Sequence, residues 1–132
     1  MIPIFGWYLK KIGSISIKRN KISKDNLNVF DDISKQIFSS DRPLIIFPQG
    51  TRLQPNDRTK FKKGSSRIYE ELNISCLPVA INSGNTWPKY GKKKIDTTLT
   101  ISILEAIEPG LKKEIFLKKL ENTIYSELDT LN

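Results

Sequence analysis

The sequence predicts an α/β fold in which a layered sheet is flanked by helices. Short apolar runs typical of strands alternate along the chain with segments whose apolar residues recur at helical spacing. The length of 132 residues suits one compact domain, and we find no internal repeat or low-complexity tract. We therefore expect a single domain over residues 1–132, with loops at the strand ends available for a ligand.

The first part of the chain predicts a short helix over 5–11 that stops at Gly13. Alternating isoleucines then predict a half-buried strand over 15–17. Ser23 is a candidate N-cap for a helix over roughly 24–39, in which four apolar residues follow at helical spacing.

The middle of the chain contains a continuous apolar run, Leu44–Phe47, which is opened by Pro43 and ended by Pro48 and Gly50. Such a run is typical of a strand that is covered on both faces. A polar loop follows over 49–62.

The last part of the chain predicts a helix over 64–72, an apolar strand over 76–81 and a loop over 82–94. Residues 98–103 alternate between apolar and polar, which predicts a strand whose apolar face is buried. A C-terminal helix then presents one apolar face: Leu117, Leu120, Ile124, Leu128 and Leu131.

The charge of the chain is strongly basic and unevenly distributed. It carries 22 Lys and Arg against 14 Asp and Glu, a formal net charge of +8. Most of the basic residues lie in three windows, 1–24, 52–67 and 89–94, which contain only one acid, Asp57. This grouping indicates an anionic partner: nucleic acid, an anionic lipid surface or a phosphorylated small molecule. A single lysine cluster fits a solvated basic face better than a binding site, and it is the three windows together that favour an anionic partner.

Two residue counts exclude several kinds of chemistry. The chain has no histidine, which excludes Ser-His and Cys-His nucleophile pairs and histidine-ligated metal sites within it. One cysteine excludes an internal disulfide framework.

No apolar run is long enough to cross a bilayer, and the opening residues are apolar first and basic second, the reverse of a secretory signal. We therefore expect a cytosolic or membrane-surface protein.

The most informative segment is Phe47-Pro48-Gln49-Gly50-Thr51-Arg52, at the end of the predicted strand. Gly50 allows a ligand or another backbone to come close, Thr51 offers a hydroxyl, and Arg52 offers a planar fork that matches a phosphate or carboxylate. By residue types alone the segment fits an anion site, and equally a plain turn whose arginine makes a surface ion pair.

A second segment, Gly13-Ser14-Ile15-Ser16-Ile17-Lys18-Arg19, places two cations at the end of a short strand. Taken alone, it fits an edge strand protected by charge.

Together these segments resemble the phospholipid and glycerol acyltransferase family. The family block Phe-Pro-Glu-Gly-Thr-Arg is matched at Phe47, Pro48, Gly50, Thr51 and Arg52. An upstream family block with a glycine, two alternating apolar residues and a terminal arginine resembles Gly13, Ile15, Ile17 and Arg19. Residues 3–7, 61–64 and 77–81 also fall in the family's order.

The resemblance implies part of a glycerol-3-phosphate acyltransferase-like fold that transfers a fatty acyl group from acyl-CoA or acyl carrier protein to 1-acylglycerol 3-phosphate. No cofactor is expected beyond this acyl donor. By analogy, Arg19 and Arg52 hold the acceptor's phosphate, and Gly50 and Thr51 shape the pocket. We include Gln49 in the binding set, although the family usually has Glu there. The resemblance also implies a peripheral protein at the cytoplasmic face of the membrane, in contact with its anionic surface.

The sequence departs from the family at its catalytic block, a His-x4-Asp pair that lies upstream of the region matched here. Because the chain has no histidine, we expect an N-terminally incomplete acyltransferase domain with no catalytic residue of its own, close to inactive in isolation. Cys76 precedes an apolar strand and fits a small buried hydrophobe better than a nucleophile.

Two alternatives remain open. The chain fits a non-catalytic module of the same fold that binds a phospholipid or phosphate. Less well, it fits a basic nucleic-acid-binding domain, because Trp87 and Tyr90 lie among lysines. No helix-turn-helix, zinc or RNP pattern accompanies them, so our primary expectation includes no nucleic-acid partner.

Overall fold

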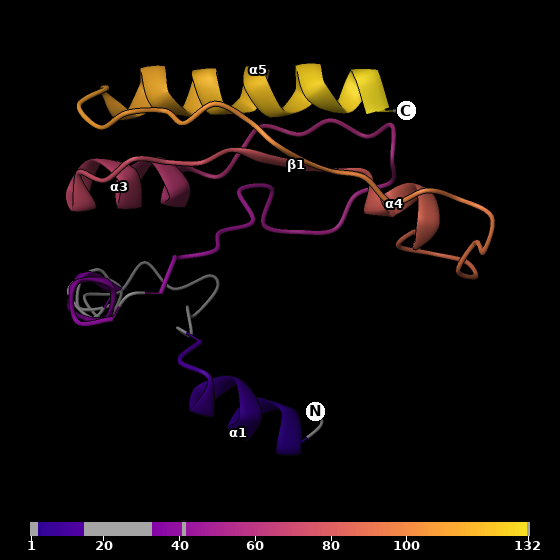
Figure 1. Ribbon diagram of the computed structural model, residues 1–132, viewed down its shortest axis with the longest axis horizontal. Helices are drawn as coiled ribbons and strands as arrows, with labels where there is room; N and C mark the ends of the chain where they lie inside the picture. Colours follow the sequence, from indigo (N-terminus) through magenta and orange to yellow (C-terminus); the bar gives the residue numbers. More distant parts are fainter. Residues whose placement is uncertain (1–2, 15–32, 41, 132) are drawn as a thin grey trace. The chain divides into compact units, whose positions relative to one another are not determined.

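A computed structural model describes residues 3–14, 33–40 and 42–131 (Figure 1). The chain divides into two compact units, residues 1–44 and residues 45–132.

The first unit begins with helix α1 (Pro3–Lys11). The helix ends as predicted, because Gly13 adopts a left-handed conformation with φ of 82°. This lets the backbone N–H of Ser14 donate to the carbonyl oxygen of Leu9 at 2.9 Å, a hydrogen bond that satisfies one of the last free carbonyls of the helix. The predicted helix over 5–11 and its stop are confirmed.

Residues 33–38 are also helical, which confirms the C-terminal part of the helix predicted over 24–39. The remainder of that helix and the strand predicted over 15–17 lie outside the described residues.

The prediction of a buried strand over Leu44–Phe47 is wrong. The segment has no strand structure, and the side chains of Ile45 and Phe47 are 76% and 77% exposed. A strand needs a hydrogen-bonding neighbour, and no described strand lies beside this run. Pro43 and Pro48 also remove donors at its two ends.

The second unit contains two helices that pack against each other, α3 (Lys63–Leu72) and α5 (Lys113–Leu131). In Figure 1, α5 runs along the top of this unit, with α3 and β1 (Val79–Ile81) beneath it. The helix predicted over 64–72 and the predicted C-terminal helix are both confirmed. Helix α3 ends at Asn73, whose φ is 49° and whose N–H donates to the carbonyl of Tyr69.

The core of this unit is aromatic and aliphatic. Its buried members are Phe61, Tyr69, Ile107, Phe116 and Leu120. The rings of Tyr69 and Phe116 are stacked with centroids 3.7 Å apart. Tyr69 also donates its hydroxyl proton to the carbonyl oxygen of Glu108. Helix α5 therefore contributes Phe116 and Leu120 to the core. Leu120 lies on the apolar face predicted from the sequence, whereas Phe116 lies outside it.

Strand β1 pairs antiparallel with β2 (Ile101–Ile103), in a register that sets Val79 opposite Ile103. An isolated bridge between Cys76 and Ile107 extends the pairing. The strands predicted over 76–81 and 98–103 are thus present but shorter. The described sheet has two strands, and the layered α/β fold of the whole domain stays a prediction.

The burial predicted for the second strand is wrong. Ala80 is fully buried and β1 packs against α5, so the helix covers the face that carries the smaller side chains. The opposite face of the sheet and its extensions is exposed and apolar, and consists of Leu77, Val79, Ile81, Leu99, Ile101 and Ile103. The alternating pattern identified an apolar face correctly, but nothing in the described structure covers it.

The segment predicted as a loop over 82–94 contains a short helix, α4 (Ser83–Thr86). All four residues of this helix are polar or glycine, so apolar periodicity could not predict it. Across the described ranges, no helix is both long and apolar enough to span a membrane.

Candidate functional site

The segment Phe47–Arg52 forms a tight turn. The backbone N–H of Gly50 donates to the carbonyl oxygen of Phe47 at 3.0 Å. Gly50 has a φ of 70°, and a Cβ atom there would lie 3.3 Å from Cγ of Lys62. The turn therefore requires glycine, both for its left-handed backbone and for the close approach of Lys62.

This turn is joined to the beginning of α3. The backbone N–H of Lys62 donates to the carbonyl oxygen of Pro48 at 2.8 Å, and Lys62 is the residue immediately before the helix. Its side chain does not cap the helix, and the first turn contains no acid. Apart from its chain neighbours and the helix's own backbone, no atom lies within 4 Å of the position of a Cβ on Gly64. The positive end of the helix dipole lies beside the turn.

The side chain of Gln49 supports the turn from the inside. Its Nε2 donates to the hydroxyl of Tyr125 at 3.4 Å. That hydroxyl donates to the carbonyl of Thr59 at 2.6 Å and accepts from the N–H of Thr59 at 3.1 Å. A phenol has one proton and two acceptor positions, so an amide donor at Gln49 completes its hydrogen bonding. A carboxylate could not donate there, which gives a physical reason for glutamine at this position.

Thr51 and Arg52 are both exposed. The Thr51 hydroxyl has one long contact, 3.5 Å, to the carbonyl of Arg52. Over residues 3–14, 33–40 and 42–131, the Arg52 guanidinium makes no hydrogen bond or ion pair, and neither does the ammonium group of Lys62 or Lys63. The alternative in which Arg52 makes a surface ion pair is therefore not what the described structure shows.

The fifth predicted residue, Arg19, lies outside the described residues. The expected pairing of Arg19 with Arg52 around one phosphate therefore stays a prediction. The structure brings together Gln49, Gly50, Thr51 and Arg52 with Lys62 and the start of α3.

Helix α5 holds the loop that follows the turn, through three polar residues spaced four apart. Glu121 accepts the backbone N–H of Phe61 at 2.8 Å, Tyr125 binds Thr59 as above, and Asp129 pairs with Arg58 at 2.5 Å. The Arg58 guanidinium also lies 5.0 Å from the centre of the Tyr125 ring. Sequence reasoning missed these residues, although a polar stripe at i, i+4, i+8 beside the apolar face is a recognisable signal.

Cys76 is half-buried and unpaired, and burial raises the pKa of its thiol. A raised pKa keeps the thiol protonated near neutral pH, and the protonated form is not the nucleophile. This agrees with its interpretation as a small apolar side chain. In the described ranges, no three Cys, Asp or Glu side chains are grouped as a metal site requires.

The geometry thus defines a class of site: a glycine turn carrying an unpaired arginine, set against an uncapped helix start. A family model described as Acyltransferase matches residues 1–82, which include the turn and the whole of α3. The chain belongs to this acyltransferase family.

Three curated relatives illustrate the similarity. A 1-acyl-sn-glycerol-3-phosphate acyltransferase of Pseudomonas aeruginosa is 30% identical over 102 residues, covering 77% of this chain and 39% of that protein. The protein of the same name from Helicobacter pylori is 27% identical, covering 96% and 53%. The human 1-acyl-sn-glycerol-3-phosphate acyltransferase beta is 26% identical, covering 73% and 35%.

The chain therefore spans between about a third and a half of the length of these relatives. No solved structure gives a significant match.

Proposed function

We propose that this chain forms the phosphate-binding part of an enzyme that transfers a fatty acyl group to 1-acylglycerol 3-phosphate in phospholipid biosynthesis. The observation that carries the proposal is that Arg52 is exposed and its side chain makes no hydrogen bond or ion pair in the described structure, on a turn that is hydrogen-bonded to the residue before α3. The names of the relatives supply the acceptor.

The acceptor's phosphate monoester fits this arrangement chemically. Arg52 offers two parallel N–H donors to two phosphate oxygens. Lys62 adds a point charge, and the N–H groups of Lys63 and Gly64, which have no acceptor in the described structure, add further donors. Arg19, by the family resemblance, would supply a second guanidinium. The acyl donor, acyl-CoA or acyl carrier protein, carries phosphate as well and suits the same basic surface.

We assign the general base of the acyl transfer to a residue outside these 132 residues. The resemblance assigns the general base to a histidine, and the chain contains none. Loss of a general base lowers a rate by about 10² to 10⁴. We therefore expect the 132-residue chain to bind the acceptor without measurable turnover. The absence of histidine equally favours the second candidate, a non-catalytic phospholipid-binding module.

A binding titration with a short-chain lysophosphatidate tests the proposal. Arg52→Ala should weaken binding about tenfold or more, because a charge-assisted bidentate contact is lost. Lys118→Ala removes the same charge from an exposed position on α5 and should leave affinity unchanged. Lysophosphatidylcholine, in which choline covers the phosphate, should bind more weakly than lysophosphatidate. Equal affinity of the Arg52 variant and the unaltered chain would remove the phosphate site.

A rate assay separates the two candidates. Turnover by the pure chain, with acyl-CoA or acyl carrier protein as donor, would contradict the assignment of the base to a residue that the chain lacks. Phosphate binding without turnover agrees with both candidates. If adding the histidine-containing part of a relative restored acylation, that result would support the acyltransferase over the non-catalytic module.

A further inference from the structure

We propose that residues 87–95, termed here the aromatic–lysine loop, bind the surface of an anionic lipid bilayer. The loop contains Trp87, Tyr90 and Ile95, whose side chains are 65%, 71% and 90% exposed. Large apolar groups that remain in water on a loop are available for insertion between lipid headgroups.

The loop is closed at its base. The backbone N–H of Lys94 donates to the carbonyl oxygen of Thr86 at 2.8 Å, and the hydroxyl of Thr97 donates to the hydroxyl of Thr86 at 3.0 Å. Gly91 turns the chain with a φ of 105°. The exposed side chains are therefore displayed by a defined loop.

The base is attached to the body of the second unit. The buried side chain of Asn82 accepts the N–H of Thr100 at 2.7 Å and donates to the carbonyl of Leu131 at 3.3 Å. A Cβ on Gly84 would lie 3.4 Å from Pro55, so α4 packs closely on the neighbouring loop. These hydrogen bonds and this packing therefore hold the base of the aromatic–lysine loop on the body of the second unit.

The charge of the loop matches an anionic surface. Residues 87–95 contain four lysines and no acid. The ammonium group of Lys89 lies 5.3 Å from the centre of the Tyr90 ring, and none of the four forms an ion pair within the part of the chain that the structure describes. Lysine stems extend along apolar surface while the ammonium groups stay at headgroup level. Each lysine near an anionic bilayer contributes about fivefold to affinity.

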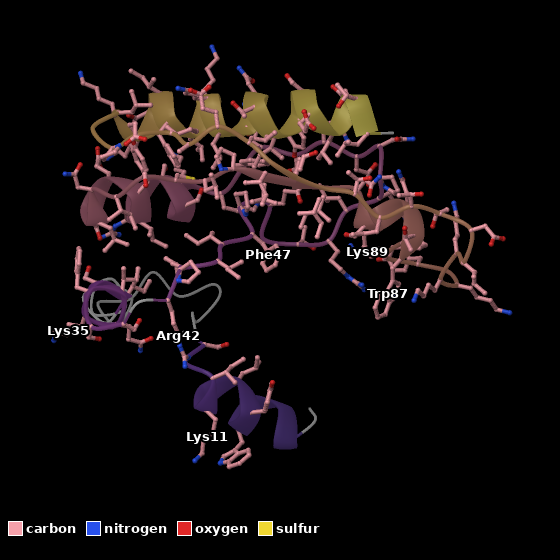
Figure 2. The ribbon with its side chains drawn as sticks, viewed as in Figure 1. Lys11, Lys35, Arg42, Phe47, Trp87 and Lys89 are labelled. Atoms are coloured by element: carbon pink, nitrogen blue, oxygen red, sulfur yellow. The ribbon has the colours of Figure 1, made fainter. Side chains whose placement is uncertain are left out.

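A further apolar group lies on the same side of the unit. Figure 2 shows Phe47, Trp87 and Lys89 on the side that faces away from α5 in this view. The loop and the exposed end of the Leu44–Phe47 run can therefore face one surface.

The mixture of side chains favours a bilayer over nucleic acid. Stacking on bases would use Trp87 and Tyr90 but leaves Ile95, the most exposed of the three, without a role. The cations are all lysines, which act as point charges, rather than arginines, which match phosphates with a planar fork. Aromatic, aliphatic and lysine side chains together are typical of an interfacial membrane contact.

The two tryptophans of the chain allow a direct test with vesicles. In a Trp7→Phe variant of the full chain, Trp87 is the one tryptophan that emits. Vesicles of phosphatidylglycerol and phosphatidylcholine should shift its emission to the blue, and brominated lipids should quench it. Pure phosphatidylcholine vesicles should bind at least tenfold more weakly. The reciprocal Trp87→Phe variant, which reports on Trp7 in α1, serves as the comparison.

Charge variants test the lysines separately from the lysophosphatidate site. Replacing Lys92, Lys93 and Lys94 with Gln should weaken vesicle binding about 100-fold. Replacing Lys112, Lys118 and Lys119 with Gln removes the same charge from exposed positions elsewhere and should have much less effect. Both variants should retain affinity for short-chain lysophosphatidate, so this inference can fail without the proposed function failing.

Three results would overturn the inference: equal losses in the two triple variants, a blue shift of Trp7 but not of Trp87, or tighter binding to single-stranded or duplex nucleic acid than to anionic vesicles at the same salt concentration.

Discussion

The backbone N–H of Lys62 donates to the carbonyl oxygen of Pro48 at 2.8 Å, and this hydrogen bond fixes the Phe47–Arg52 turn beside the start of α3. The turn and the helix are separated in sequence by a polar loop. Their junction brings the Gly50 backbone, the turn residue Arg52 and the unbonded N–H groups of Lys63 and Gly64 into one region of the second unit.

Gly50→Ala should destabilise the second unit by about 1–2 kcal/mol, because its φ of 70° disfavours a Cβ atom. The new methyl group would also lie 3.3 Å from Cγ of Lys62. Urea unfolding followed by circular dichroism measures the change. Gly64→Ala is the matched control: Gly64 lies in a helix with open space around it, so alanine there should stabilise by about 0.5–1 kcal/mol. Equal effects of the two substitutions would contradict the left-handed turn.

Tyr125→Phe should lower the free energy of unfolding by about 1–3 kcal/mol. The substitution removes the hydroxyl that bonds both backbone groups of Thr59 and leaves the half-buried carbonyl of Thr59 without its partner. Tyr90→Phe removes a hydroxyl from an exposed ring and should change stability by less than about 0.5 kcal/mol. If the two variants unfolded at the same denaturant concentration, the role given to Tyr125 would be wrong.

Gln49→Glu should restore the residue usual in the family at a cost in this chain. A carboxylate cannot donate to the Tyr125 hydroxyl, so the stability should fall by roughly 1 kcal/mol above pH 6. The added negative charge near Arg52 should also weaken lysophosphatidate binding. Thermal unfolding and the binding titration measure the two effects. A variant that is more stable than the unaltered chain would show that Gln49 does not serve Tyr125.

The Cys76 thiol should react slowly with an aromatic disulfide reagent at pH 8, because burial raises its pKa and the thiolate is scarce. In the unfolded chain the thiol should react at the ordinary rate. The folded state holds this proton more tightly than the unfolded state, so the thiol's contribution to stability is complete below the unfolded pKa and falls as pH rises through the folded pKa. Cys76→Ala should remove this alkaline loss, and an unchanged pH dependence in that variant would contradict it.

How far the sequence predicts this structure differs between its parts. Helices α1, α3 and α5 follow from apolar periodicity and from local stops such as Gly13, because a helix satisfies its own hydrogen bonds. The strands were harder to predict because pairing depends on neighbours distant in the chain. The Leu44–Phe47 run has the composition of a buried strand, yet it has no described partner and stays exposed.

The candidate site shows the same contrast. The turn residues Gly50 and Arg52 were identifiable from their types and order. The contacts of Lys62 and Tyr125 with this turn were not, because they come from segments that only folding brings together. The position of Arg19 relative to the turn stays a prediction.

Amide chemical shifts measured by NMR during titration with glycerol 3-phosphate test the central claim most directly. We expect the largest changes on the backbone amides of residues 49–52 and 62–65, and we expect Arg52→Ala to reduce them at the same ligand concentration. Changes confined to other segments, such as α5, or the same changes in the Arg52→Ala variant, would contradict it.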